Sequence, residues 1–338
     1  MSLIHAAPAR RGGTPWWGST EAMVAGVLLL AMALIGTINP AFWSLDNIFS
    51  LLRSNVVIGI MALGVLLVMI SGGIDVSFPA FAVAAMYLVV RAMVEWGISG
   101  VALPFLAATL IGACLGAVNA TIVHRLRMIP LIVTLGTAAM VRGLLNGVVG
   151  TSNVNINKYP DSLIGFGSTD LVTLTNAKGA SFGLTATLLL YLGLALAIHL
   201  VLTRTMIGRS VFAYGASPES AKRVGFRTGR TLLFVYVTAG ALAGFAGLLH
   251  SSMIWMANPR DFVGWELDVI AAVVLGGASI FGGRGSVLGT MLGVFTLVMI
   301  KNSLILMGID TTWQRVVVGA MLIAAVALTA LRDRKALV

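Results

Sequence analysis

VALPFLAATLIGACLGAVNATIV, residues 101–123, is an unbroken run of 23 residues without a charged side chain. At 1.5 Å per residue, a helix of this length measures about 35 Å, which is enough to cross the hydrocarbon core of a bilayer. The bilayer core contains no water to form hydrogen bonds with the backbone, so a spanning segment must bond its own amide and carbonyl groups, as a helix does. The run therefore predicts a transmembrane helix.

The composition extends this prediction to the whole chain. Hydrophobic residues make up 58% of its 338 residues, and charged residues only 10%. Soluble domains carry about 25% charged residues, so this chain is not an ordinary soluble domain. The length leaves room for roughly ten spans of about 20 residues each. The expected fold is one all-α domain integral to the membrane, with helices that break or re-enter where glycines cluster.

Apolar runs separated by polar turns recur along the sequence. They predict about ten transmembrane helices, at residues 22–38, 56–71, 79–94, 101–123, 131–149, 184–202, 232–249, 266–280, 287–305 and 315–331. The transmembrane domain would then cover residues 22–331, between tails at 1–21 and 332–338. An even number of spans places both tails on one side, and basic residues in them predict that this side is cytoplasmic: Arg10, Arg11, Arg332, Arg334 and Lys335.

The net charge of +10 follows the same topology. Lys and Arg concentrate in the tails and turns that are expected on one side of the membrane. This bias is typical of membrane proteins, so the basic character reflects orientation in the bilayer. We expect no nucleic-acid partner.

The longest charged interruption is residues 203–231, between the sixth and seventh predicted spans. Inside it, Ser217 suits a helix N-cap, Pro218 suits the first helical position, and Gly225 suits a stop. Glu219 near the start and Lys222 and Arg223 near the end of this segment match the charges of the helix dipole. These residues predict a short cytoplasmic helix over Ser217–Val224, which is either a solvated connector or a docking element for a soluble partner.

A second segment, SGGIDVSFP at residues 71–79, places an acid between two apolar runs. An ionised Asp75 is costly there unless it meets a partner or water. Paired glycines and Pro79 free backbone groups, which broken helices direct at a polar pathway. A tight interfacial turn with a hydrated carboxylate would account for the same residues.

Polar side chains also occur inside the predicted spans, among them Asn119. Arg142 is the costliest and must face a cavity or pair with an acid or carbonyl groups. Thr134, Thr137 and Asn146 lie on the same span, where helix–helix hydrogen bonds would equally explain them. The translocation-path residues predicted from these segments are Gly72, Gly73, Asp75, Ser77, Thr134, Thr137, Arg142 and Asn146.

A third segment, residues 275–286, is rich in glycine. It does not match the phosphate-binding pattern G-x-x-x-x-G-K-[ST], which occurs nowhere in the chain. We expect a sharp cytoplasmic turn with helices packed closely through glycine, built from Gly276, Gly277, Gly282, Gly283 and Arg284. No metal-ligand spacing and no nucleophile–base pair is recognisable, so the chain is expected to be neither an enzyme nor the holder of a metal or cofactor.

Four stretches together resemble the permease subunits of ATP-binding-cassette importers of the ribose and simple-sugar class. They are GGIDVS at 72–77, TLGT at 134–137 followed by RG at 142–143, GRSVFAYG at 208–215, and ELDVIAAVVLGG at 266–277. The resemblance runs from Asn55 to Ala330. It extends to rhamnose and autoinducer-2 importer permeases.

The resemblance implies a bacterial inner-membrane permease that works as a homodimer or heterodimer. It implies cytoplasmic ATPase subunits, which carry ATP and Mg²⁺, and a periplasmic or lipid-anchored sugar-binding protein. The helix at Ser217–Val224 would be the coupling helix, with Ser217, Pro218, Glu219, Ser220, Lys222, Arg223 and Gly225 as its contact residues. The chain itself would form the path for a monosaccharide or small polyol.

One departure bears on the substrate. Relatives continue the GGID motif with Leu-Ser-Val-Gly, whereas this chain has Val76-Ser77-Phe78-Pro79. A ring and a proline replace a small, flexible step, so the substrate need not be ribose. The sequence also leaves open a branched-chain amino-acid permease, an ATP-independent facilitator or channel, and a non-transporting scaffold or receptor.

Overall fold

A computed structural model describes residues 20–175, 179, 181–310, 312–321, 323 and 327. Within this part, 8 helices are long and apolar enough to cross a membrane. The predicted helical membrane fold is therefore confirmed, and the count of about ten is approximate. The eight are α1 (Thr20–Ile38), α2 (Leu45–Ile70), α3 (Phe78–Trp96), α4 (Ala102–Leu126), α5 (Pro130–Leu144) with the π-helical turn η3 (Leu145–Val149), α7 (Thr187–Arg204), α10 (Thr228–Ile254) and α12 (Val287–Leu306).

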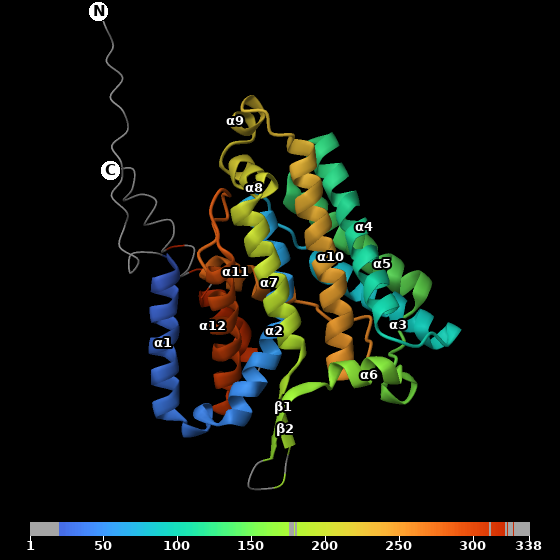
Figure 1. The fold of residues 1–338 in the computed structure, drawn as a ribbon, viewed down its shortest axis with the longest axis vertical. Helices are drawn as coiled ribbons and strands as arrows, with labels where there is room; N and C mark the ends of the chain where they lie inside the picture. Colours follow the sequence, from blue (N-terminus) through green and yellow to red (C-terminus); the bar gives the residue numbers. More distant parts are fainter. Residues whose placement is uncertain are drawn as a thin grey trace, which may run out of the picture.

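The centre of the bundle is α2, which is buried without a gap from Gly59 to Ile70. Helices α10 and α12 pack against it, and α4 packs along α10 (Figure 1). Glycine lets α4 and α10 approach closely, because a Cβ on Gly116 would lie 2.1 Å from the carbonyl oxygen of Tyr236. Small residues at such crossings are typical of membrane helices.

Helix α2 begins eleven residues before the predicted start at residue 56, because a charge inside it finds partners. Ser44 caps the helix by accepting a hydrogen bond from the Asn47 amide at 3.3 Å. The Arg53 guanidinium donates to the carbonyl of Gly167 at 3.3 Å and to that of Met253 at 3.1 Å. The predicted span began after Arg53 because a charge is costly in a membrane helix, but hydrogen bonds to these two carbonyls allow Arg53 to lie within α2.

The predicted span at 266–280 is a shorter helix, α11 (Trp265–Leu275), of 11 residues. At 1.5 Å per residue it is about 16 Å long, roughly half of the hydrocarbon thickness. Gly277 has φ +90°, outside the helical region, and the chain is irregular from there to Ser286. The second break, between α2 and α3, has no regular secondary structure over residues 73–77.

The polar segment between η3 and α7 contains regular secondary structure. It contains η4 (Ile156–Lys158), α6 (Asp161–Gly167) and a hairpin of β1 (Asp170–Thr175) and β2 (Ser181–Thr185). The strands are antiparallel, with Asp170 opposite Thr185 and Thr175 opposite Ser181. Figure 1 shows this hairpin at the end of the bundle opposite α9, which we call the hairpin end.

The charged segment 203–231 forms two helices at the other end, which we call the α9 end. Helix α8 (Met206–Ala216) was not predicted, whereas α9 (Pro218–Arg223) confirms the predicted short helix. Ser217 caps α9 by accepting a hydrogen bond from the Ser220 amide at 3.2 Å. Gly225 follows with φ +91°. A short helix of 4 residues, η2 (Pro40–Trp43), completes the elements between α1 and α2.

Several predictions fall on parts of the chain that the structure does not describe. The tail at 332–338 and nearly all of the tail at 1–21 lie outside the described residues. The predicted last span at 315–331 is described only in part, and residues 312–321 of that region are helical.

Candidate functional site

Three segments that are far apart in the sequence meet where α2 ends. The Gly283 amide donates a hydrogen bond to the carbonyl of Ile70 at 2.8 Å. A Cβ on Gly215 would lie 1.8 Å from the same carbonyl oxygen, and a Cβ on Gly282 would lie 2.7 Å from the Cα of Gly72. No side chain fits at these positions. We call Gly72, Gly215, Gly282 and Gly283 the glycine junction.

A cavity of about 720 Å³ lies beside the glycine junction, and we call it the α9 cavity. Predicted coupling residues and predicted path residues line it together: Pro218, Glu219 and Lys222 from α9, and Gly72 and Gly73 from the break after α2. The two groups were predicted from separate segments for separate roles. The structure brings them to one space.

Three aromatic side chains that the sequence did not single out also line the α9 cavity: Tyr214, Tyr236 and Phe281. Phe281 is 84% exposed in the Gly-rich turn. Burial raises the pKa of Tyr214 above its usual value, so this phenol stays neutral and keeps its hydrogen-bond donor. Polar phenols beside an apolar ring give the cavity both hydrogen-bonding and stacking surfaces.

The break between α2 and α3 buries a chain of polar groups. Asp75 is 3% exposed, and its Oδ1 accepts hydrogen bonds from the amide and from the hydroxyl of Ser77, both at 2.6 Å. Asn119 of α4 donates to the Ser77 hydroxyl at 2.9 Å. The Asp75 carboxylate also lies just before the first residue of α3, where the helix dipole favours negative charge.

One oxygen in this network of buried polar groups has no hydrogen-bond partner among the described residues. This atom is the buried Oδ1 of Asn119. Buried acceptors are normally satisfied, and no described residue satisfies this one. The sequence offered one signal for Asn119: it is the only amide side chain in the uncharged run 101–123.

One threonine of helix α5 forms hydrogen bonds with the same break. Thr134 Oγ1 accepts a hydrogen bond from the Val76 amide and donates one to the Ile74 carbonyl, both at 3.3 Å. One turn further along, the buried Thr137 hydroxyl donates to the Thr134 carbonyl at 3.3 Å. Of the predicted path residues, the structure thus gathers Gly73, Asp75, Ser77, Thr134 and Thr137 around the break.

Arg142 and Asn146 lie elsewhere. Arg142 contacts the carbonyls of Asp261 at 3.5 Å and Phe262 at 3.4 Å, and its Nη2 lies 3.4 Å from Glu266 Oε1. The predicted need for an acid and carbonyl partners is met at the start of α11. Asn146 is exposed on the π-helical turn and does not approach the break.

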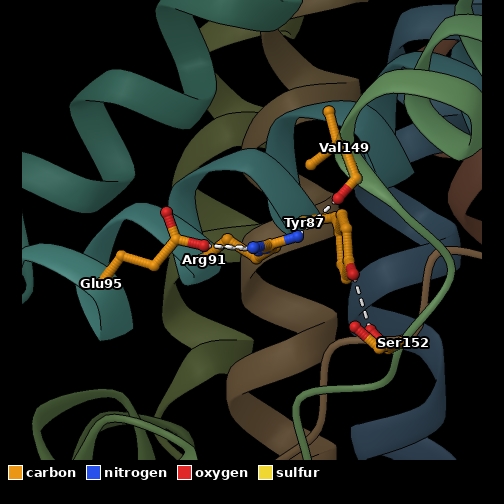
Figure 2. Close-up of polar contacts among 5 residues, drawn as sticks. All are labelled: Tyr87, Arg91, Glu95, Val149 and Ser152. Carbon is orange, nitrogen blue, oxygen red and sulfur yellow. Dashed lines mark hydrogen bonds and ion pairs between the residues drawn. The ribbon is translucent and has the colours of Figure 1, made fainter.

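A cluster at the other end of α3 also holds α5, as Figure 2 shows. Arg91 forms an ion pair with Glu95 and donates a hydrogen bond to the carbonyl of Val149, the last residue of η3. The Tyr87 hydroxyl donates to the carbonyl of Ser152 at 2.6 Å. Helix α3 therefore holds α5 near both of its ends. The only sequence signal was the i, i+4 spacing of an acid and a base.

The hairpin end carries a smaller polar hollow of about 400 Å³. It is closed by an antiparallel bridge between Val154 and Ala257. Four of its five lining side chains are neutral hydrogen-bonding groups: Thr151, Asn153, Asn155 and Asn258, beside Arg260. Among the described residues, no group of 3 or more His, Cys, Asp or Glu is placed to hold a metal ion.

The comparisons with known proteins identify related chains. Residues 47–326 match the family described as "Branched-chain amino acid transport system / permease component". The sequence is 31% identical over 312 residues to the ribose import permease protein RbsC of Escherichia coli (strain K12), covering 92% of this chain and 93% of that protein. No solved structure matches this chain.

Two further relatives come from the same strain. The sequence is 33% identical over 325 residues to the galactose/methyl galactoside import permease protein MglC, covering 90% of this chain and 93% of that protein. It is 31% identical over 307 residues to the D-allose transport system permease protein AlsC, covering 89% of each. All three relatives are permease components named for a sugar.

Proposed function

Because this chain belongs to the family of branched-chain amino acid transport system permease components, we propose that it is the membrane-spanning permease subunit of an ATP-binding-cassette importer. Its cargo is a monosaccharide or a similar small polyol. The observation that carries this proposal is the similarity, over about nine-tenths of the chain, to permeases named for ribose, galactose and allose.

The polar groups of the chain support a neutral, hydroxyl-rich cargo. Around the break they are hydroxyls, amides and backbone groups, with one carboxylate already engaged by Ser77. The hollow at the hairpin end is lined mainly by amides. Such groups exchange hydrogen bonds with hydroxyls at little net free energy, which suits a path that must release what it binds.

We place the α9 end in the cytoplasm, with both chain termini on the same side. Basic residues concentrate at the α9 end, in α9 itself and in the turns beside it, as the positive-inside rule requires. ATPase subunits on separate chains then dock on α9, and a solute-binding protein delivers cargo to the hairpin end. A second permease, identical or similar, completes the path.

The mechanism follows from how the elements connect. Closure of the ATPases displaces α9, which shares the α9 cavity with the break after α2. Helices α8 and α2 meet at the glycine junction, so a rotation of α8 reaches the end of α2 directly. Repeated switching between outward-open and inward-open states then moves the sugar without any chemistry on this chain.

The test is affinity purification of the full-length tagged chain from its native membranes, followed by mass spectrometry. We expect a stoichiometric ATPase, and its loss when the whole segment Ser217–Val224 is altered. The control is Arg209→Ala on α8. Sugar uptake into liposomes by the purified chain alone, without ATP, would instead establish a facilitator and overturn the importer assignment.

A further inference from the structure

A second cavity at the α9 end gathers basic side chains. It has a volume of about 720 Å³ and lies between the end of α4, helix α9 and the start of α10. Five of its nine lining residues are cations: Arg125, Arg127, Lys222, Arg227 and Arg230. We call this space the basic cavity.

The basic cavity lacks compensating negative charge in the part of the chain that the structure describes. No Asp or Glu lines it. None of its five cations forms an ion pair or a side-chain hydrogen bond with another described residue. Like charges at close range repel, and an anion between them removes that repulsion and gains several attractions at once. The cavity is therefore shaped for an anion with several oxygen atoms.

Position places this anion at the membrane surface. Helices α4 and α10 are both long and apolar enough to span a bilayer, and the basic cavity lies at their adjoining ends. A Cβ on Gly229 would lie 2.6 Å from the His124 ring, so the two helix ends are in contact there. In a bilayer spanned by these two helices, the cavity would lie at the depth of the phospholipid headgroups.

A shallow apolar groove lies on α4, one turn before Arg125 of the basic cavity. It has a volume of about 280 Å³ and is lined by Ala117, Val118, Thr121 and Ile122. Thr121 and Ile122 precede Arg125 by four and three residues, so the groove and the cation share one face of the helix. Val118 is 46% exposed on this face, and exposed aliphatic residues flank the cavity at Leu126 (65%) and Ile129 (64%).

We propose that this face of α4 and α10 binds one anionic phospholipid. The phosphate occupies the basic cavity, and an acyl chain lies in the α4 groove. An acidic protein surface would satisfy the cations but would leave the groove empty, whereas a phospholipid matches both. Arg127 and Lys222 line both the basic cavity and the adjoining α9 cavity, where Glu219 also lies. A bound lipid would therefore contact the helix proposed to couple to the ATPase.

The first test measures lipid binding to the purified full-length chain by native mass spectrometry. Phosphatidylglycerol, phosphatidylcholine and glycerol 3-phosphate are titrated separately. We expect phosphatidylglycerol to bind in preference to the other two, and Arg125→Gln with Arg127→Gln to weaken it about tenfold or more, since each cation near an anionic surface contributes measurably to binding. Arg204→Gln with Arg209→Gln, which alters two cations outside the cavity, is the matched control.

The second test keeps every charge and fills the groove with Thr121→Trp on the exposed face of α4. We expect this variant to lose affinity for phosphatidylglycerol and to keep the weak binding of glycerol 3-phosphate. Unfolding temperatures of all variants are compared, so that a misfolded chain is recognised.

Three results would overturn the proposal. One is equal phosphatidylglycerol binding by the wild-type chain and the Arg125/Arg127 variant. Another is glycerol 3-phosphate binding as tightly as the lipid, which would reduce the site to a phosphate site without a lipid tail. The third is unchanged lipid binding together with loss of the co-purified ATPase, which would assign the cations to a protein interface.

Discussion

At the scale of single residues, the glycine junction depends on the absence of a side chain at Gly215 and Gly282, where a Cβ would collide with backbone atoms. Gly215 has no positive φ, so its backbone would accept another residue. Its requirement is purely spatial, because the added Cβ would lie 1.8 Å from the Ile70 carbonyl oxygen and 2.7 Å from the Gly283 amide. Neither neighbour is a flexible side chain that could move aside.

Gly215→Ala should therefore disrupt the junction. We expect a loss of roughly 2 kcal/mol or more in stability, because overpacking against backbone atoms forces whole segments to shift. The measurement is the unfolding temperature of the purified chain, together with sugar uptake by the assembled importer. Gly136→Ala is the control, since its Cβ would meet nothing within 4 Å; equal effects of the two changes would refute the packing argument.

Asp261 is a residue whose protonation should matter. It lies in the loop between α10 and α11, one carboxylate oxygen is buried without a partner among the described residues, and burial raises its pKa to about 6. A carboxyl with a raised pKa binds its proton more tightly in the folded chain than in the unfolded one. Its contribution is therefore present at acidic pH and is lost as pH rises through about 6.

We expect the unfolding temperature of the wild-type chain to fall between about pH 4 and pH 6, and Asp261→Asn to reduce this dependence. Asp310→Asn is the matched control: Asp310 lies in an exposed loop, where hydrogen bonds from Thr312 hold its pKa below the usual range. Identical pH profiles for wild type and Asp261→Asn would show that this carboxyl does not titrate in that range.

At the scale of elements, α3 and α5 behave as one unit. Thr134 joins α5 to the break before α3, and Arg91 with Tyr87 joins the last turns of α3 to the chain after α5. Two attachments near opposite ends oppose both sliding and tilting of α5. A displacement of the break should therefore carry α5 with it.

Thr134→Val removes the hydroxyl and keeps the shape. It leaves the Val76 amide without its side-chain acceptor, so we expect a loss of about 1 kcal/mol in stability and impaired uptake. The control is Thr121→Val, whose hydroxyl bonds only the Ala117 carbonyl within its own helix, at 2.7 Å. If both variants unfold at the wild-type temperature, the hydrogen bonds of Thr134 do not stabilise the break.

The elements also show what sequence reasoning could reach. Helix α9 was predictable because its cap, its first proline and its stop are all local signals. Helix α2 was placed too short because the partners of Arg53 are carbonyls of Gly167 and Met253, more than a hundred positions away. Helix α11 was placed too long because an apolar run does not reveal where a helix unwinds against its neighbours.

For the candidate site, the sequence indicated the segments involved but did not indicate how they come together. The segments at 72–77, 208–215 and 275–286 were evident, but nothing in their spacing predicted that they meet. Their meeting depends on the packing of α2, α8 and α12, which no local pattern encodes. Arg142 and Asn146 shared a span with Thr134 and yet lie outside the cluster, because one helix presents different faces and different depths.

At the scale of the whole molecule, the two ends of the bundle differ in chemistry. The α9 end holds the α9 cavity and the basic cavity, and the hairpin end holds a hollow lined mainly by amides. This polarity fits our proposal that one end receives the ATPases and the other receives the sugar.

Replacing Glu219 and Arg223 together by alanine should uncouple the two ends. Both lie on α9, away from the membrane spans, so we expect a folded chain whose partner ATPase hydrolyses ATP without driving uptake. The measurement compares ATP hydrolysis and sugar uptake in the same proteoliposomes, with Arg209→Ala as the control. Normal uptake by the double variant would rule out α9 as the coupling helix.

The glycine junction has a consequence for how such a permease can change over time. Its contacts join backbone to backbone, through the Ile70 carbonyl, the Gly283 amide and the Cα of Gly72. A joint of this kind has no side-chain rotamers to adjust, so its geometry is set by the backbones of the three segments. Substitutions of residues that line the neighbouring cavities would leave these backbone contacts unchanged. The cargo specificity of such a permease could therefore change while the glycine junction stays the same.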